Sequence, residues 1–122
     1  MTEDRFHEPT ELERAFLRIV TLDYPESAAQ IENCEVDDYD LTGYCDVRIC
    51  SGTPSHAKNA MCDGPSLPAQ PPCIPLVDTI LWIDDSGYLR SIEVVVYGEP
   101  LDDVYQRFVK AASRAELQYH RG

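Results

Sequence analysis

The chain has 122 residues, of which 43% are hydrophobic and 26% charged, a composition that supports one hydrophobic core and excludes a wholly disordered chain. Asp and Glu number 22 against 10 Lys and Arg, and the net charge of −12 argues against a nucleic-acid ligand because it repels phosphates. No apolar run reaches the roughly 18 to 20 residues of a membrane helix and no signal-peptide pattern opens the chain. We therefore expect a cytoplasmic protein without membrane contact.

The first third of the chain predicts two helices after a loose leader, residues 1–8. In TELERAFLRIV, Thr10 is suited to the N-cap, and Glu13 three residues later completes a capping box before apolar residues at helical spacing. Pro25 is suited to the first position of a second, short helix, followed by ESAAQIEN.

The pattern changes from helix to strand after Cys34. Cys45, Val47 and Ile49 alternate with polar residues, which predicts a half-buried strand after a turn at Gly43. Residues 51–75 then hold six of the nine prolines and two glycines, so we expect a long Pro-rich loop there.

Residues 76–97 predict an antiparallel hairpin at the core of the sheet. LVDTILWI and YLRSIEVVVY are rich in β-branched and aromatic residues, and DDSG between them offers Gly87 for a turn with positive φ. Strict alternation along the second arm predicts two faces: Tyr88, Arg90, Ile92, Val94 and Val96 on one, Leu89, Ser91, Glu93, Val95 and Tyr97 on the other.

A C-terminal helix is predicted from EPLDDVYQRFVKAASRAELQ, with Pro100 at its first position, Glu99 as a mediocre cap and residues 118–122 as a loose tail. Together these elements predict one α+β domain: an antiparallel sheet of three to five strands with the N-terminal and C-terminal helices packed on it.

Negative charge is concentrated in one region of the sequence. Between Arg18 and Arg48 lie eight acidic residues and no Lys or Arg. Such a surface favours a basic protein partner, and the alternative is a solvated strand edge that keeps the protein soluble. The leading hypothesis is a non-catalytic interaction protein, with candidate partner-binding residues Glu35, Asp37, Asp38, Tyr39, Asp40 and Asp46.

The five cysteines support a second hypothesis, a zinc-stabilised module whose working surface is the loop 51–75. An odd number cannot pair fully within one chain, which leaves free thiols or metal ligands, although a bond between Cys62 and Cys73 is a further alternative. The intervals between the cysteines depart from the tight C-x2-C spacing of zinc sites. The leading expectation is therefore a protein without a cofactor, and zinc is the alternative. The candidate ligands are Cys45, Cys50, His56, Cys62 and Cys73.

The third hypothesis is an enzyme that uses a cysteine and a histidine. His56 lies in the same predicted loop as Cys62, but a working pair also needs hydrogen-bond contact and a third group to orient the imidazole. Because no phosphate-binding glycine motif or nucleophile elbow is present either, we expect a protein without catalytic activity.

The sequence DDSGYLRSIEVVVYGEP resembles the DGYLSxLE hairpin of small uncharacterised bacterial proteins, especially actinobacterial ones, some of which are similar to immunity proteins of toxin systems. LDYPESAAQIE followed by a cysteine-bearing strand fits the same layout, and the resemblance spans residues 21–100. This chain has GYCDVRIC where such proteins show a compact Cys-Gly-Cys-Gly-Cys run. The resemblance implies a small α+β domain and carries over no catalytic residue.

Overall fold

The computed structural model describes residues 5–38, 43–68, 75–97 and 103–119 and confirms the α+β class. Three α-helices accompany a six-stranded antiparallel sheet, where three to five strands were predicted. In chain order the elements are α1 (Glu11–Val20), α2 (Pro25–Gln30), a 3-10 turn (Ile31–Asn33), β1 (Cys34–Asp37), β2 (Tyr44–Ile49), β3 (Ala60–Asp63), β4 (Leu67–Pro68), β5 (Pro75–Ile83), β6 (Leu89–Val96) and α3 (Val104–Ser113).

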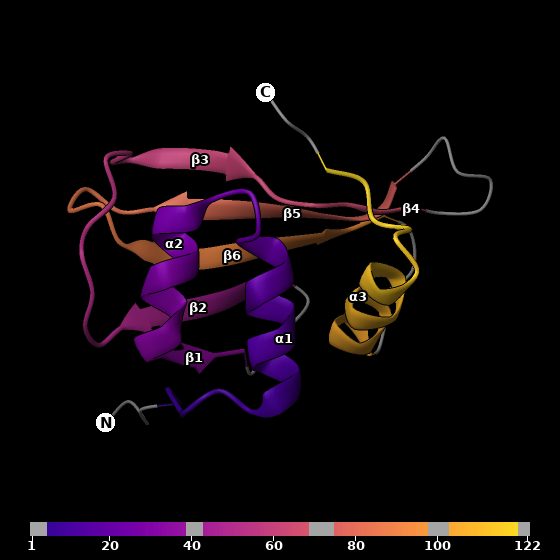
Figure 1. The fold of residues 1–122 in the computed structure, drawn as a ribbon, viewed down its shortest axis with the longest axis horizontal. Helices are drawn as coiled ribbons and strands as arrows, with labels where there is room; N and C mark the ends of the chain where they lie inside the picture. Colours follow the sequence, from indigo (N-terminus) through magenta and orange to yellow (C-terminus); the bar gives the residue numbers. More distant parts are fainter. Residues whose placement is uncertain (1–4, 39–42, 69–74, 98–102, 120–122) are drawn as a thin grey trace.

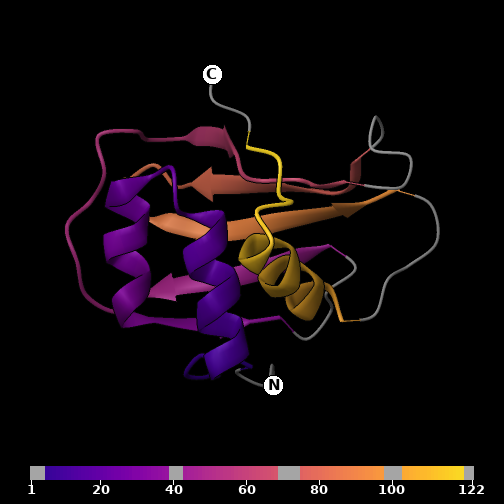
Figure 2. The same ribbon diagram turned by 45° about the vertical axis from the view of Figure 1, so that its right-hand side comes forward.

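The sheet forms one layer and the helices form the other. Its strand order is β1-β2-β6-β5-β3, with β4 paired to one end of β5. All three helices lie on the same face of the sheet (Figure 1), and the turned view shows that arrangement from a second side (Figure 2). No described helix covers the opposite face, and no described helix is long and apolar enough to cross a membrane.

The predicted hairpin forms the centre of the sheet as β5 and β6. Gly87 has a φ of 92° in the connecting turn, a region that only glycine enters readily. The strict alternation predicted for β6 needs a correction, because the pairing shifts register where Trp82 faces Ser91 and Ile83 faces Leu89. A β-bulge at this point turns Leu89 inward to the buried face that also holds Ile92.

Helix α1 forms as the sequence predicts. The Thr10 hydroxyl accepts a hydrogen bond from the backbone N–H of Glu13, and the Glu13 carboxylate accepts one from the backbone N–H of Thr10. Its buried side packs against α3 through Phe16, whose ring centroid lies 4.3 Å from that of Tyr105 and 5.4 Å from that of Phe108. These rings join the two helices over the sheet core.

Both predicted tails are partly ordered by backbone hydrogen bonds to distant residues, which the spacing of hydrophobic residues in the sequence does not predict. His7 exchanges two backbone hydrogen bonds of 2.9 Å with Val36, so the predicted loose leader continues the sheet beside β1. Near the other end, Gln118 pairs in the same way with Ser66. Each tail gains order because it satisfies the hydrogen-bonding groups of an exposed edge.

Two further boundaries differ from the predictions. The Pro-rich stretch 51–75 is not one continuous loop, because residues 60–63 contain no proline and pair with β5 as the edge strand β3. Helix α3 begins at Val104 and ends at Ser113, with Asp103 as N-cap at a φ of 54°. The predicted cap Glu99 and first residue Pro100 lie outside the described residues.

Candidate functional site

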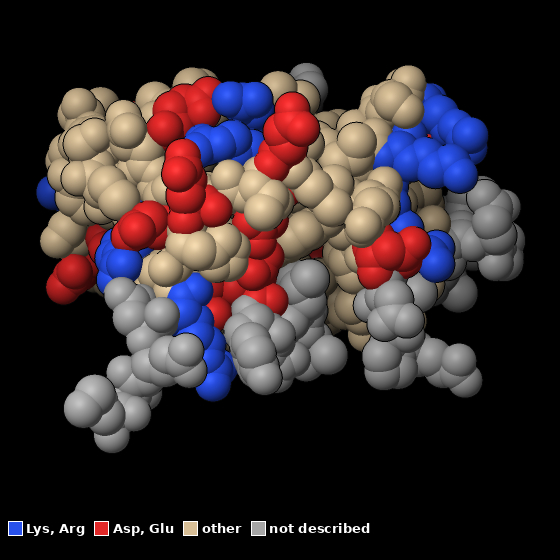
Figure 3. Space-filling model, turned by 90° about the horizontal axis from the view of Figure 1, so that it is seen from below, with Lys and Arg blue, Asp and Glu red and all other residues tan. Residues whose placement is uncertain are grey.

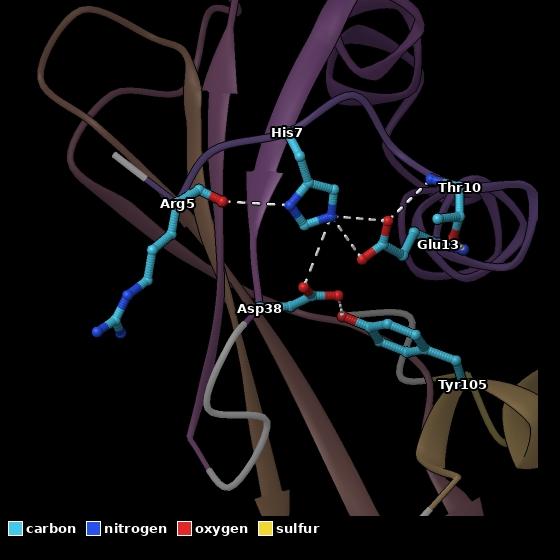
Figure 4. A network of polar contacts seen from close by, with 6 residues as sticks. All are labelled: Arg5, His7, Thr10, Glu13, Asp38 and Tyr105. Atoms are coloured by element: carbon cyan, nitrogen blue, oxygen red, sulfur yellow. Dashed lines mark hydrogen bonds and ion pairs between the residues drawn. The ribbon is translucent and has the colours of Figure 1, made fainter. Parts of the chain in front are cut away.

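Four side chains from distant parts of the sequence meet at the β1 edge of the helix layer and form a carboxyl cluster: His7, Glu13, Asp38 and Tyr105 (Figure 4). The backbone pairing of His7 with β1 fixes the imidazole, and the capping box fixes Glu13 in the first turn of α1. Asp38 directly follows β1, and Tyr105 lies in the first turn of α3.

The imidazole is the centre of this cluster. His7 Nε2 lies 3.0 Å from both carboxylate oxygens of Glu13 and 3.8 Å from Oδ1 of Asp38. On its other side, Nδ1 lies 3.2 Å from the carbonyl oxygen of Arg5. The Tyr105 hydroxyl donates to Oδ2 of Asp38 at 2.9 Å, and the backbone N–H of Thr10 donates to Glu13 at 2.8 Å. Each of the two carboxyl groups therefore has a hydrogen-bond partner other than His7.

The two carboxyl groups have opposite pKa shifts. Burial, together with the hydrogen bond to Glu13, raises the pKa of Asp38 to about 6. Burial also acts to raise the pKa of Glu13, but hydrogen bonds from Asp38, Thr10 and His7 outweigh it and lower the pKa to about 2. The hydrogen bond to Glu13 raises the pKa of His7. At mildly acid pH the pair can therefore hold one proton, on Asp38.

The opposite surface of the molecule carries a second group of acids, on what we call the open sheet face. Its members alternate along the strands with residues that are buried or half-buried: Glu35, Asp37, Tyr44, Asp46, Arg48, Met61, Asp63, Asp78, Ile80, Trp82, Ser91, Glu93 and Val95, with Arg90 added by the bulge. Six of these residues are acidic and two are basic, a net charge of 2 − 6 = −4.

The open sheet face is hollowed near its middle. A depression of about 410 Å³ is lined by Tyr44, Asp46, Trp82, Arg90 and Ser91. Tyr44 is 48% exposed, and the Trp82 indole donates to the Glu93 carboxylate at 3.1 Å. Burial and the neighbouring Asp37 raise the pKa of Asp46, which directly faces Asp37 in the strand pairing.

The structure separates the residues that the sequence predicted as one acidic face. Glu35, Asp37 and Asp46 lie on the open sheet face, while Asp38 turns inward to the carboxyl cluster with 14% of its side chain exposed. Tyr39 and Asp40 lie outside the described residues. Viewed from the β1 edge, acidic side chains form a broken band across the molecule, with Lys and Arg side chains beside it (Figure 3).

The structure does not assemble the predicted zinc ligands into one site. Cys45 lies in β2 and Cys62 in β3, three strand positions away, which places their backbones about 14 Å apart, too far to share one ion. Cys50 is exposed at the end of β2, and His56 bonds Glu26 at 2.8 Å instead. Cys73 lies outside the described residues.

Three of the four described thiols, those of Cys34, Cys45 and Cys62, suit packing better than thiolate chemistry. Burial raises the pKa of Cys34 to about 11 and that of Cys45 to about 12, and it also raises the pKa of Cys62. These three groups stay neutral at neutral pH, where only the thiolate is a good nucleophile or ligand.

Sequence reasoning missed His7 and Tyr105 and read Glu13 only as a capping residue. The capping box was the available signal, because it fixes the Glu13 carboxylate at the start of α1, close to the preceding histidine. Nothing local in the sequence predicts that β1 and α3 complete the cluster.

Comparison of the chain with known protein families, curated proteins and solved structures found no match in any of the three.

Proposed function

We propose that the chain is a non-catalytic interaction protein whose open sheet face binds a basic protein partner. The observation that carries this proposal is the composition of that face: aromatic and aliphatic side chains stand at outward positions and carboxylates surround them. Antiparallel sheets with one solvated face normally place polar residues at such positions.

Apolar side chains in the middle of the open sheet face support a binding role. Met61, which is 60% exposed, pairs with Trp82 across β3 and β5, and Ile80 and Val95 are half-buried nearby. Trp and Tyr supply much of the binding energy in protein interfaces, and polar groups form the rim around them. Trp82 and Tyr44 are therefore the expected anchors of the contact.

The charge of the face selects the chemistry of the partner. Asp37, Asp46 and Glu93 lie beside or close to these anchors, and the whole face has a net charge of −4. Complementary charge speeds encounter and disfavours acidic competitors, so a partner with Lys and Arg around an apolar patch fits this surface.

The resemblance of residues 84–100 to hairpins of bacterial proteins similar to immunity proteins adds a more specific hypothesis. An acidic immunity-type protein would mask a basic toxin by covering its charged surface. Masking needs surface complementarity only and no chemistry by this chain.

The test is affinity capture from a lysate of the native cells, with the purified protein immobilised. One variant removes three charges from the open sheet face: Asp37→Asn, Asp46→Asn and Glu93→Gln. The matched control removes three exposed charges elsewhere: Glu11→Gln, Asp85→Asn and Glu116→Gln. Mass spectrometry identifies the captured proteins, and each is then titrated in purified form.

We expect one basic protein to bind the wild type and the control equally and the open-face variant weakly. Its affinity should fall as the ionic strength rises from ~50 to ~500 mM, because screening weakens exposed charge contacts. Equal capture by all three proteins, an acidic partner, or no specific capture would each refute the proposal.

A further inference from the structure

We infer that His7, Glu13 and Asp38 form a binding site for a divalent transition-metal ion such as Zn²⁺. The three side chains each offer one ligand atom, and these atoms all lie within 4.8 Å of one another. This site is independent of the proposed function, because it lies on the helix side of the sheet, and it shares no residue with the cysteine set predicted from the sequence.

The distances between the ligand atoms resemble those around a metal ion. Ligands that are each about 2.1 Å from one ion stand roughly 3 to 3.5 Å from each other. His7 Nε2 lies 3.0 Å from the nearer oxygens of Glu13 and 3.8 Å from Oδ1 of Asp38. All three ligand atoms lie within 4.8 Å of one another, so side-chain adjustments of about 1 Å would bring them to coordination distance from one ion.

The ligand set has the outer partners that metal sites use to orient their ligands. The Arg5 carbonyl faces Nδ1 of His7 at 3.2 Å, which directs Nε2 toward the carboxylates. The backbone N–H of Thr10 donates to Glu13 at 2.8 Å, and the Tyr105 hydroxyl donates to Asp38 at 2.9 Å. Three different elements thus hold the three ligands in place without the metal.

The chemistry of the donors selects the class of ion. An imidazole nitrogen with two carboxylates suits Zn²⁺ and related ions better than Mg²⁺ or Ca²⁺, which prefer oxygen ligands only. Within the described part of the chain, Glu13 and Asp38 form ion pairs with His7 and with no Lys or Arg side chain. The His7 side chain is 42% exposed, so an ion and a coordinated water can reach the cluster from solvent.

The experiment is calorimetric titration of the reduced 122-residue chain with Zn²⁺, compared with His7→Gln and with the matched control His56→Gln. His56 also contacts a carboxylate, Glu26, at 2.8 Å, but it belongs to no group of three described ligands. His7→Gln changes a partly exposed side chain, and Asp38→Asn provides a second, nearly isosteric variant. Co²⁺ binding, followed by visible absorption, reports whether thiolates take part.

We expect one Zn²⁺ per chain, binding at least ~10-fold weaker in His7→Gln and in Asp38→Asn, and unchanged in His56→Gln. Bound Co²⁺ should show no thiolate charge-transfer band, and Mg²⁺ at equal concentration should not compete. The inference fails if Zn²⁺ does not bind, if His7→Gln binds Zn²⁺ as tightly as the wild type, or if Co²⁺ reports cysteine ligands.

Discussion

Asp37 and Asp38 are neighbours in the sequence and have the same side chain, yet they belong to different environments. Asp37 faces Asp46 across the open sheet face, and Asp38 lies in the carboxyl cluster with His7 and Tyr105. The side of the sheet therefore determines what a carboxylate in this acidic run can do. Asp37 on the open side faces another carboxylate, whereas Asp38 on the helix side is held by contacts with a tyrosine hydroxyl and an imidazole.

The largest expected difference in the free energy of unfolding is between substitutions on the two faces of β6. Ile92 is fully buried on the helix side, so Ile92→Ala should lower the free energy of unfolding by about 2 to 5 kcal/mol through lost burial and a cavity. Val95 is half-buried on the open sheet face, and Val95→Ala should cost less than ~1 kcal/mol. Urea denaturation measures both, and equal losses would show that the open face is part of the core.

Glu13→Ala is the next largest change. It leaves the backbone N–H of Thr10 and the imidazole of His7 without their acceptor, and we expect a loss of about 2 kcal/mol. Glu11→Ala, at an exposed position in the same turn, is the control and should cost below ~1 kcal/mol. If the two variants lose the same stability, Glu13 acts only as another acid near the helix N-terminus.

The carboxyl cluster also predicts the direction of a pH effect in metal-free protein. The pKa of Asp38 is raised from 3.8 to about 6, so between these pH values the folded state keeps a proton that the unfolded state has lost. The stability that this proton contributes is present below pH 3.8 and is lost as the pH rises to about 6. The raised pKa of His7 adds stability below 6.5 that is lost as the pH rises through its folded value. The lowered pKa of Glu13 acts oppositely and removes stability as the pH falls from 4.5 toward about 2.

Asp38→Asn isolates the contribution of Asp38, because the amide keeps the shape of the protonated acid. Between pH 4 and pH 6 the wild type should lose about 1 to 2 kcal/mol more than the variant, after allowance for solvent screening. Thermal unfolding in a chelating buffer across this range measures the difference. Parallel profiles for the two proteins would contradict the pKa assignment.

Glu35→Gln should have the smallest effect. The ion pair of Glu35 with Arg48, at 2.7 Å, is solvent-exposed on the open face, and Arg48 keeps its contact with the Phe6 ring. We expect a change below ~0.5 kcal/mol in urea denaturation. A loss above ~1 kcal/mol would mean that this pair helps to hold β1 to β2.

Local signals in the sequence predicted most of the fold but only fragments of the candidate sites. The capping box at Thr10 and Glu13 and the turn at Gly87 depend on neighbouring residues, and the structure confirms both. The bulge that redirects Leu89 depends on the register between two strands, which alternation within one strand does not determine.

The carboxyl cluster depends on contacts that are distant in the sequence. His7 reaches Glu13 only because its backbone pairs with Val36, and Tyr105 reaches Asp38 only because α3 packs beside α1. The sequence shows that acidic residues are concentrated between Arg18 and Arg48. It does not show which of them lie on the open sheet face and which lie in the carboxyl cluster, because that depends on where each strand begins and ends. The predicted zinc ligands show the same limit, since spacing along the chain gave no sign that two other strands of the sheet separate Cys45 in β2 from Cys62 in β3.

The most direct test of the division between the two acidic groups is the Kd of the captured partner for two charge variants. Asp37→Asn with Asp46→Asn alters the open sheet face, and Asp38→Asn alters the carboxyl cluster, each without changing side-chain size. We predict that the first weakens binding at least ~10-fold, about 1.4 kcal/mol, and that the second changes it less than ~2-fold. Weaker binding by Asp38→Asn than by the double variant would contradict the account.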